Sequence, residues 1–156
     1  MKSSLFLGTL FDLQYWCQLF IKLQTISTEN NAHIGAKKFN SDISGWNTSS
    51  VTDMKWMFYE TTIFNGAYLK NWDVSKVTDM HEMFWECCNG GASLDLSLWD
   101  TSSVTTMKYM FYGVPEFNSD ISGWDVSNVE DFQEMFYEAY AFNQDLSQWN
   151  ISPGKL

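Results

Sequence analysis

A repeat of about 25 residues constrains the fold of this chain more than any other feature. Five tryptophans mark it at intervals of 26, 27, 25 and 25 residues: Trp46, Trp72, Trp99, Trp124 and Trp149. A valine follows each of the first four after five residues, and a Met-Phe pair comes later at a fixed offset. A period of this length with fixed apolar positions predicts stacked repeats, each forming one turn. Turns one, two, three, four and five begin at Phe39, Phe64, about Ala92, Phe117 and Phe142.

The spacing inside a turn indicates which local structures to expect. Trp124 and Val126 are two residues apart, so a strand would place both on one face. The steps of three that separate Val129, Phe132 and Met135 suit a helix or a 3₁₀ turn instead. We therefore expect an α/β solenoid of about five turns over residues 39–156. Each turn would hold a short parallel strand and a short helix, with all five tryptophans in one buried column.

The repeat unit also resembles a known family. The segments FNSDISGWDVSNVEDFQEMF and AFNQDLSQWNIS are similar to BspA-like leucine-rich repeats, in the version named after mycoplasma lipoproteins. This resemblance extends over about residues 39 to 152. It implies a leucine-rich-repeat-like scaffold for adhesion and protein binding at a cell surface or outside the cell, without catalytic residues. An intracellular or organellar assembly is the alternative location.

Residues 1–38 do not carry the repeat, and we expect them to form an N-terminal helical cap followed by a loop. Phe6, Leu10, Leu13 and Phe20 share one helical face. A signal peptide and a membrane helix are alternatives, although polar residues such as Asp12 interrupt the apolar run. We expect residues 4–24 to be helical and to cover turn one. Membrane contact is expected only through residues 1–27.

The charge balance narrows the classes of partner. The net charge is −10 and all nine basic residues are lysines, which disfavours binding to nucleic acid and to anionic lipids. A basic protein or a divalent cation is compatible with this charge. Cys17, Cys87 and Cys88 form no spaced metal motif, and reduced, buried thiols are expected. No arrangement of a nucleophile with a base appears, so the chain is not expected to be an enzyme.

Two sets of repeated residues are candidates for binding. Asp73, Asp100 and Asp125 each follow a tryptophan and are expected to face solvent. Stacked carboxylates repel by about 1 to 3 kcal/mol, so serine hydroxyls, backbone N–H groups or a divalent cation must offset the repulsion. The second set is a row of aromatic residues, three of which precede a glutamate: Tyr59, Trp85, Tyr112 and Tyr137. This row either stabilises the stack or forms an aromatic, acidic strip for a partner.

These observations favour a non-catalytic protein-binding repeat module for surface adhesion or ligand presentation. The alternative is a small structural or accessory subunit docked within a larger assembly, including a membrane-associated one. The fifth turn ends just after its expected strand, so association through an open C-terminal edge is also expected.

Overall fold

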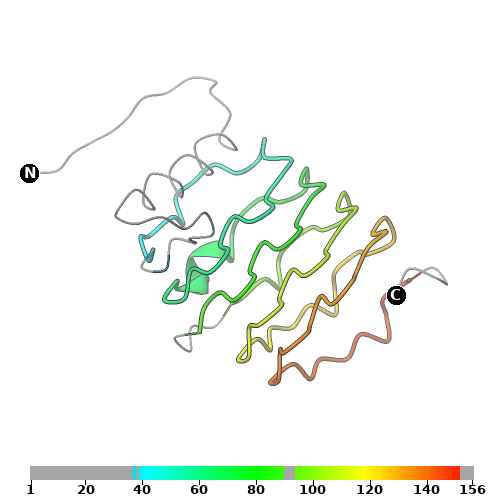
Figure 1. Cartoon of the computed structure of the whole chain (residues 1–156). Coiled ribbons are helices and arrows are strands. Elements are labelled where there is room, and N and C mark those ends of the chain that lie inside the picture. The colour runs from blue at the N-terminus through cyan, green and yellow to red at the C-terminus, as the bar shows by residue number, and fades with distance from the viewer. Residues whose placement is uncertain (1–36, 38, 90–93, 152–156) are drawn as a thin grey trace, which may run out of the picture.

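Successive repeats lie side by side as the layers of one stack. The computed structural model describes residues 37, 39–89 and 94–151. In Figure 1 the turns follow one another in sequence order, from cyan near residue 40 to orange and red near the C-terminus. The expected cap at residues 1–38 lies outside the described residues apart from Lys37, so its helix and its contact with turn one stay predictions.

The expected α/β solenoid of strands and helices is wrong. Among the described residues the only helix is the 3₁₀ helix η1, Gly66–Leu69, and no strand is formed. Parallel pairing between turns is limited to isolated bridges that join Asp53 to Asp79, Asp79 to Thr106, and Thr106 to Asp131. No parallel sheet therefore covers a face of this part of the chain.

The backbone hydrogen bonds explain why neither regular structure forms. In the segment 54–60, every second N–H donates to a carbonyl of the next turn. The donors are Met54, Trp56, Phe58 and Glu60, and the acceptors are Asp79, His81, Met83 and Trp85. The intervening N–H groups of Met57, Tyr59 and Thr61 instead donate to carbonyls three residues back. Half of the donors thus join turns and half close local turns, which completes neither a ladder nor a helix.

The backbone dihedrals are consistent with this alternation. In turns one to four, two residues four positions apart adopt positive φ, which both helices and strands exclude, and Cys88 in turn two is a further such residue at 62°. In turn one these are Trp56 and Glu60, at 58° and 52°. The same pairs recur in the later turns as Glu82 and Glu86, Tyr109 and Gly113, and Glu134 and Glu138. The apolar steps of three that suggested a helix therefore belong to a series of tight turns.

The core consists of side-chain columns that run through the stack. The rings of Phe58, Phe84 and Phe111 stack on the next phenylalanine, ending at Phe136, with centroids 5.4, 5.5 and 5.9 Å apart. Each such pair contributes about 0.5 to 1.5 kcal/mol beyond the area that it buries. The valines and methionines at the repeat positions of turns one to four are buried beside this column. Packing between repeats, rather than regular secondary structure, stabilises the fold.

The tryptophans also join the turns through hydrogen bonds. The indole Nε1 of Trp72, Trp99, Trp124 and Trp149 donates to a carbonyl of the preceding turn, that of Ile43, Leu69, Leu96 and Ile121 respectively, at 3.0 to 3.2 Å. Trp99 stacks on Trp124, and Trp46 stacks on Trp72. The inner three tryptophans are buried as expected, whereas Trp46 and Trp149 in the end turns are only half-buried.

Short polar side chains shape the corners of each turn. An aspartate or asparagine Oδ1 accepts a hydrogen bond from the N–H two residues later, which forms an Asx-turn. In turn four, Asp120, Asp125 and Asp131 accept from Ser122, Ser127 and Gln133. The polar residues between the apolar columns therefore direct the chain around each corner.

Candidate functional site: an aromatic and acidic strip

The row of aromatic residues predicted from the sequence is a continuous stack on the outside of the turns. The rings of Tyr59 and Trp85 lie 6.0 Å apart, those of Trp85 and Tyr112 lie 3.9 Å apart, and Tyr137 lies 4.7 Å beyond Tyr112. Each residue directly follows the stacked phenylalanine of its turn, so the stacking of the phenylalanines also aligns these four residues between turns. We refer to these four residues as the aromatic column.

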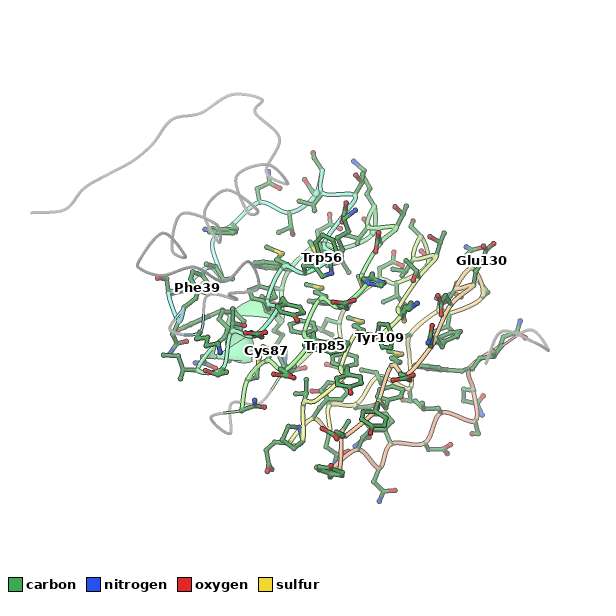
Figure 2. The ribbon with its side chains drawn as sticks, viewed as in Figure 1. Phe39, Trp56, Trp85, Cys87, Tyr109 and Glu130 are labelled. Atoms are coloured by element: carbon green, nitrogen blue, oxygen red, sulfur yellow. A yellow bond between two sulfur atoms is a disulfide. The ribbon has the colours of Figure 1, made fainter. Side chains whose placement is uncertain are left out.

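A second row of rings borders the aromatic column. His81 makes edge contacts with both Trp56 and Tyr109, at 6.3 and 6.0 Å. Tyr109 in turn lies edge-on to Trp85 at 5.3 Å. Figure 2 labels Trp56, Trp85 and Tyr109, which come from three successive turns. Trp56 is 51% exposed. The two rows together form a surface about two residues wide along the stack.

Carboxylates border this surface. Glu60, Glu82, Glu86, Glu134 and Glu138 occupy the positions of positive φ beside the rings. Glu60 pairs with Lys37 at 3.5 Å, and Glu82 contacts His81 at 2.6 Å. No described residue forms an ion pair with Glu86, Glu134 or Glu138. We refer to the aromatic column, the second row of rings and these five glutamates together as the strip.

The electrostatics of the strip are those of a negative surface. Burial raises the pKa of Tyr59, and the charges of Glu60, Glu82 and Glu86 raise it further. Loss of solvation likewise raises the pKa of Tyr112, followed by the effects of Tyr137, Glu138, Glu134 and Glu86. Negative charge thus opposes ionisation of both phenols. An approaching cation would be stabilised by the same field.

The backbone conformation at the glutamates is unfavourable for residues with a side chain. A left-handed conformation costs about 1 to 2 kcal/mol at residues other than glycine. Glu86 and Glu138 nevertheless adopt φ values of 48° and 59°, whereas Gly113, at the same repeat position, adopts 65° without this cost. Trp56 and Tyr109 adopt φ values of 58° and 55° at the other of these two repeat positions, so the conformation belongs to the turn and not to the carboxylates alone.

A shallow depression lies where Gly113 replaces a glutamate. Its volume is 230 Å³, and it is lined by Glu86, Asn89, Gly113, Pro115, Glu138 and Tyr140. Because Gly113 has no side chain, the Glu86 side chain lies over it, with Cγ only 3.0 Å from the place that a Cβ at residue 113 would take. Tyr140 is 79% exposed beside it. The depression thus combines two carboxylates and an exposed aromatic ring.

The comparisons with known proteins identify a family. A family described as "Mycoplasma protein of unknown function, DUF285" matches residues 20–94 and 68–155. The chain belongs to this family. DUF285 is associated with BspA-like surface repeats of mycoplasmas, but the strand and helix of a leucine-rich repeat are not found in the described part of this DUF285 chain. No curated protein and no solved structure matches it.

The other predicted set, the aspartate ladder of this DUF285 chain, has local partners. Asp73, Asp100 and Asp125 each accept a hydrogen bond from the N–H of a serine two residues later, at 3.1, 3.1 and 3.0 Å. Hydrogen bonds from Ser75 and from Ser127 lower the pKa of Asp73 and Asp125. No group of three or more His, Cys, Asp or Glu residues able to hold a metal ion occurs among the described residues. The divalent cation stays a hypothesis, to be tested by comparing melting temperatures in calcium and in chelator.

Sequence reasoning missed several residues of this surface in the DUF285 chain. Trp56, Glu82, Tyr109 and Glu134 lie ten residues after successive tryptophans. This fixed offset was visible in the sequence, but the varied residue types concealed it. No local sequence pattern predicts the depression at Gly113, because residues about 25 positions apart in the sequence line it.

Two further observations concern residues outside the strip. The sulfur atoms of Cys87 and Cys88 are joined in a disulfide, so the expectation of reduced thiols is wrong for these two residues, although both are buried as expected. Cys17 lies outside the described residues. Within the described residues of the DUF285 chain, no helix is long and apolar enough to cross a membrane. The expected membrane contact through residues 1–27 lies outside the described part.

Proposed function

We propose that this chain is a non-catalytic protein-binding module whose strip binds a basic segment of a partner protein. The depression between Glu86 and Glu138 is the observation that carries this proposal. A lysine or arginine side chain placed there would lie between two carboxylates that have no ion-pair partner among the described residues. Surface adhesion or ligand presentation is the setting that the family favours.

The geometry of the rings supports a polypeptide partner over a flat ligand. Stacking covers the faces of Trp85 and Tyr112, so the aromatic column presents mainly ring edges and phenol groups. A sugar or a nucleic-acid base needs an open ring face for stacking. In the aromatic column only Tyr137, at its end, is exposed, at 49%, and in the second row Trp56 is 51% exposed and lies edge-on to His81. Side chains of a protein can instead fill the spaces along the ring edges.

The exposure of the glutamate charges indicates which contacts would supply most of the binding free energy. A solvent-exposed ion pair contributes only about 0.2 to 1 kcal/mol, and salt weakens it. The two carboxylates would therefore orient a basic side chain, while apolar contact with Tyr137 and Tyr140 would supply most of the remaining affinity. Binding should be salt-dependent without being abolished by salt.

A defined peptide tests this proposal. Binding of a capped pentalysine peptide to the full chain would be measured by calorimetry at low and physiological salt. The double variant Glu86→Gln/Glu138→Gln should bind about fivefold more weakly, because two exposed ion pairs are worth about 1 kcal/mol together. The control Asp100→Asn/Glu130→Gln changes the net charge equally at exposed positions outside the strip. Equal weakening in both double variants would show attraction by net charge alone and would refute the strip as the site.

A further inference from the structure

The Cys87–Cys88 disulfide lies in the wall of the depression. Glu86 and Asn89, which line the depression, flank the two cysteines directly in the sequence. Both cysteines are buried, whereas Glu86 and Asn89 are exposed. A change at the disulfide therefore acts on the segment that carries one of the two carboxylates of the depression.

Cys88 differs from the other described residues at its repeat position. This position lies 16 residues after the tryptophan of each turn, and its other members are Thr62, Pro115 and Tyr140. None of these three is buried, and Pro115 and Tyr140 line the depression. Among the four, Cys88 alone is buried and alone adopts a positive φ, at 62°. With its sulfur bonded to Cys87, Cys88 is thus held away from the depression in a conformation that is unfavourable for a residue with a side chain.

Cys87, in contrast, belongs to the core by its repeat position. The residues at this position form a buried row, Thr61, Cys87, Val114 and Ala139. The N–H of each member donates to the carbonyl of the phenylalanine three residues before it, which for Cys87 is Phe84 at 3.0 Å. The Cys87 sulfur also lies 3.2 Å from the Thr61 hydroxyl. Breaking the S–S bond would therefore release Cys88 and leave Cys87 in place.

We propose that Cys87 and Cys88 form a thiol–disulfide exchange site that regulates binding at the depression, an inference that rests on the proposed function. The reactant is a dithiol. Its thiolate attacks the Cys88 sulfur, the S–S bond breaks, and the Cys87 sulfur leaves and takes up a proton. The second thiol of the reactant then displaces the Cys88 thiol from the mixed disulfide. The reactant is oxidised to a disulfide, and the cysteine pair is reduced to two thiols.

The two redox states differ in which side chains face the depression. In the oxidised state the Cys88 side chain is held inside, and the space beside Glu86 is open to a basic side chain. In the reduced state the backbone at Cys88 leaves the left-handed region, and its side chain turns toward the depression as those of Pro115 and Tyr140 do. The Cys88 thiol then occupies part of the 230 Å³ between Glu86 and Glu138. The oxidised state is therefore the state that binds.

Alkylation of the full chain tests the exchange. A Cys17→Ser background leaves Cys87 and Cys88 as its only cysteines. The folded chain is treated with dithiothreitol, desalted and exposed to N-ethylmaleimide, and the modified residues are identified by peptide mass spectrometry. Cys88 should react at least about tenfold faster than Cys87, because Cys88 turns toward solvent and Cys87 stays in the core. Without dithiothreitol, neither residue should react.

Calorimetry with the capped pentalysine peptide tests the regulation. Reduction should weaken binding about threefold, the contribution of one exposed ion pair, and reoxidation should restore the affinity. Cys88→Thr, which introduces the residue that turn one has at this position, should bind as weakly as the reduced chain and should not respond to dithiothreitol. Cys17→Ser is the matched control and should respond as the unsubstituted chain does.

Each outcome bears on the proposal. A pair that dithiothreitol leaves oxidised in the folded chain would overturn it, and so would an unchanged affinity after reduction. Unfolding on reduction, followed by tryptophan fluorescence, would also overturn it, because the disulfide would then only stabilise the fold. Absence of pentalysine binding in both redox states would refute the proposed function and the regulation with it, whereas the alkylation rates would still decide whether the exchange site exists.

Discussion

The hydroxyl group of Thr48 is buried without a hydrogen-bond partner among the described residues. Val74 and Val126 occupy the equivalent position in other turns, two residues after the tryptophan. Thr101 is also equivalent, but its hydroxyl donates to the Asp125 carbonyl at 2.9 Å. An unsatisfied buried hydroxyl costs about 1 to 3 kcal/mol.

We therefore expect Thr48→Val to raise the free energy of unfolding by about 1 kcal/mol. Thr101→Val is the matched control and should lower it, because the Asp125 carbonyl loses its donor. Urea unfolding followed by tryptophan fluorescence measures both changes. If Thr48→Val were as destabilising as Thr101→Val, the Thr48 hydroxyl would have to be satisfied after all.

The left-handed backbone at Glu138 allows stability and binding to be separated at one residue. Both Glu138→Ala and Glu138→Gly remove the carboxylate, but only glycine removes the conformational strain at φ 59°. The glycine variant should be more stable than the alanine variant by about 1 kcal/mol, from thermal unfolding. Both should bind pentalysine equally weakly. Normal binding by the glycine variant would mean that the carboxylate has no part in recognition.

At the scale of the structural element, the indole hydrogen bonds join each turn to the turn before it. Trp99 donates to the Leu69 carbonyl at 3.0 Å inside the core. Trp99→Phe keeps an aromatic ring for stacking on Trp124 but removes the indole donor, so that the Leu69 carbonyl keeps only its hydrogen bond from the N–H of Trp72. The expected loss in unfolding free energy is about 0.5 to 1.5 kcal/mol from the hydrogen bond, plus the loss of ring volume.

Trp149→Phe provides the comparison for this experiment. Trp149 makes the equivalent bond to the Ile121 carbonyl, but it lies half-buried in the end turn, where water can replace the donor. Trp149→Phe should therefore lower the free energy of unfolding, measured with denaturant, by clearly less than Trp99→Phe does. Equal costs for both substitutions would indicate that ring volume, rather than the hydrogen bond, determines the effect.

At the scale of the whole molecule, the hydrogen-bonded aspartates predict how stability depends on pH. Six aspartates spread over the stack have a lowered pKa, and in five of them a hydrogen bond from the serine two residues later is the main cause. The six are Asp42, Asp73, Asp95, Asp120, Asp125 and Asp145. For Asp95, the Lys70 ammonium is the larger cause. A lowered pKa in the folded state stabilises the fold above the unfolded pKa, near 3.8.

This stability is lost as the pH falls through the folded-state pKa values. Because these aspartates stay ionised in both states, we expect them to leave the melting temperature nearly constant from about pH 7 to 5. The melting temperature should decrease below about pH 4, where the aspartates of the unfolded chain bind protons first. Asp120→Asn, which keeps an acceptor oxygen, should make the decrease less steep. A melting temperature that stays level down to pH 2 would contradict the assigned hydrogen bonds.

The repeat period, the buried apolar columns and the stacked aromatic column were predictable from the sequence. They depend on which residue types recur at a fixed interval, because repeats stacked in register place equivalent side chains such as Phe84 and Phe111 next to each other. The choice of strand and helix was wrong for a related reason. Steps of two and three residues suit regular structures, but also suit the tight turns seen between Met54 and Thr61.

Only the tertiary structure decided how the backbone groups are paired. The N–H of Trp56 donates to His81 and the indole of Trp99 donates to Leu69, across 25 and 30 residues respectively. The depression at Gly113 likewise depends on which turn lies next in the stack. The repeat determines that layers stack. The contacts between neighbouring layers determine which backbone donors, carboxylates and rings have a partner. A local sequence pattern does not contain these contacts, because the residues involved lie about 25 to 30 positions apart.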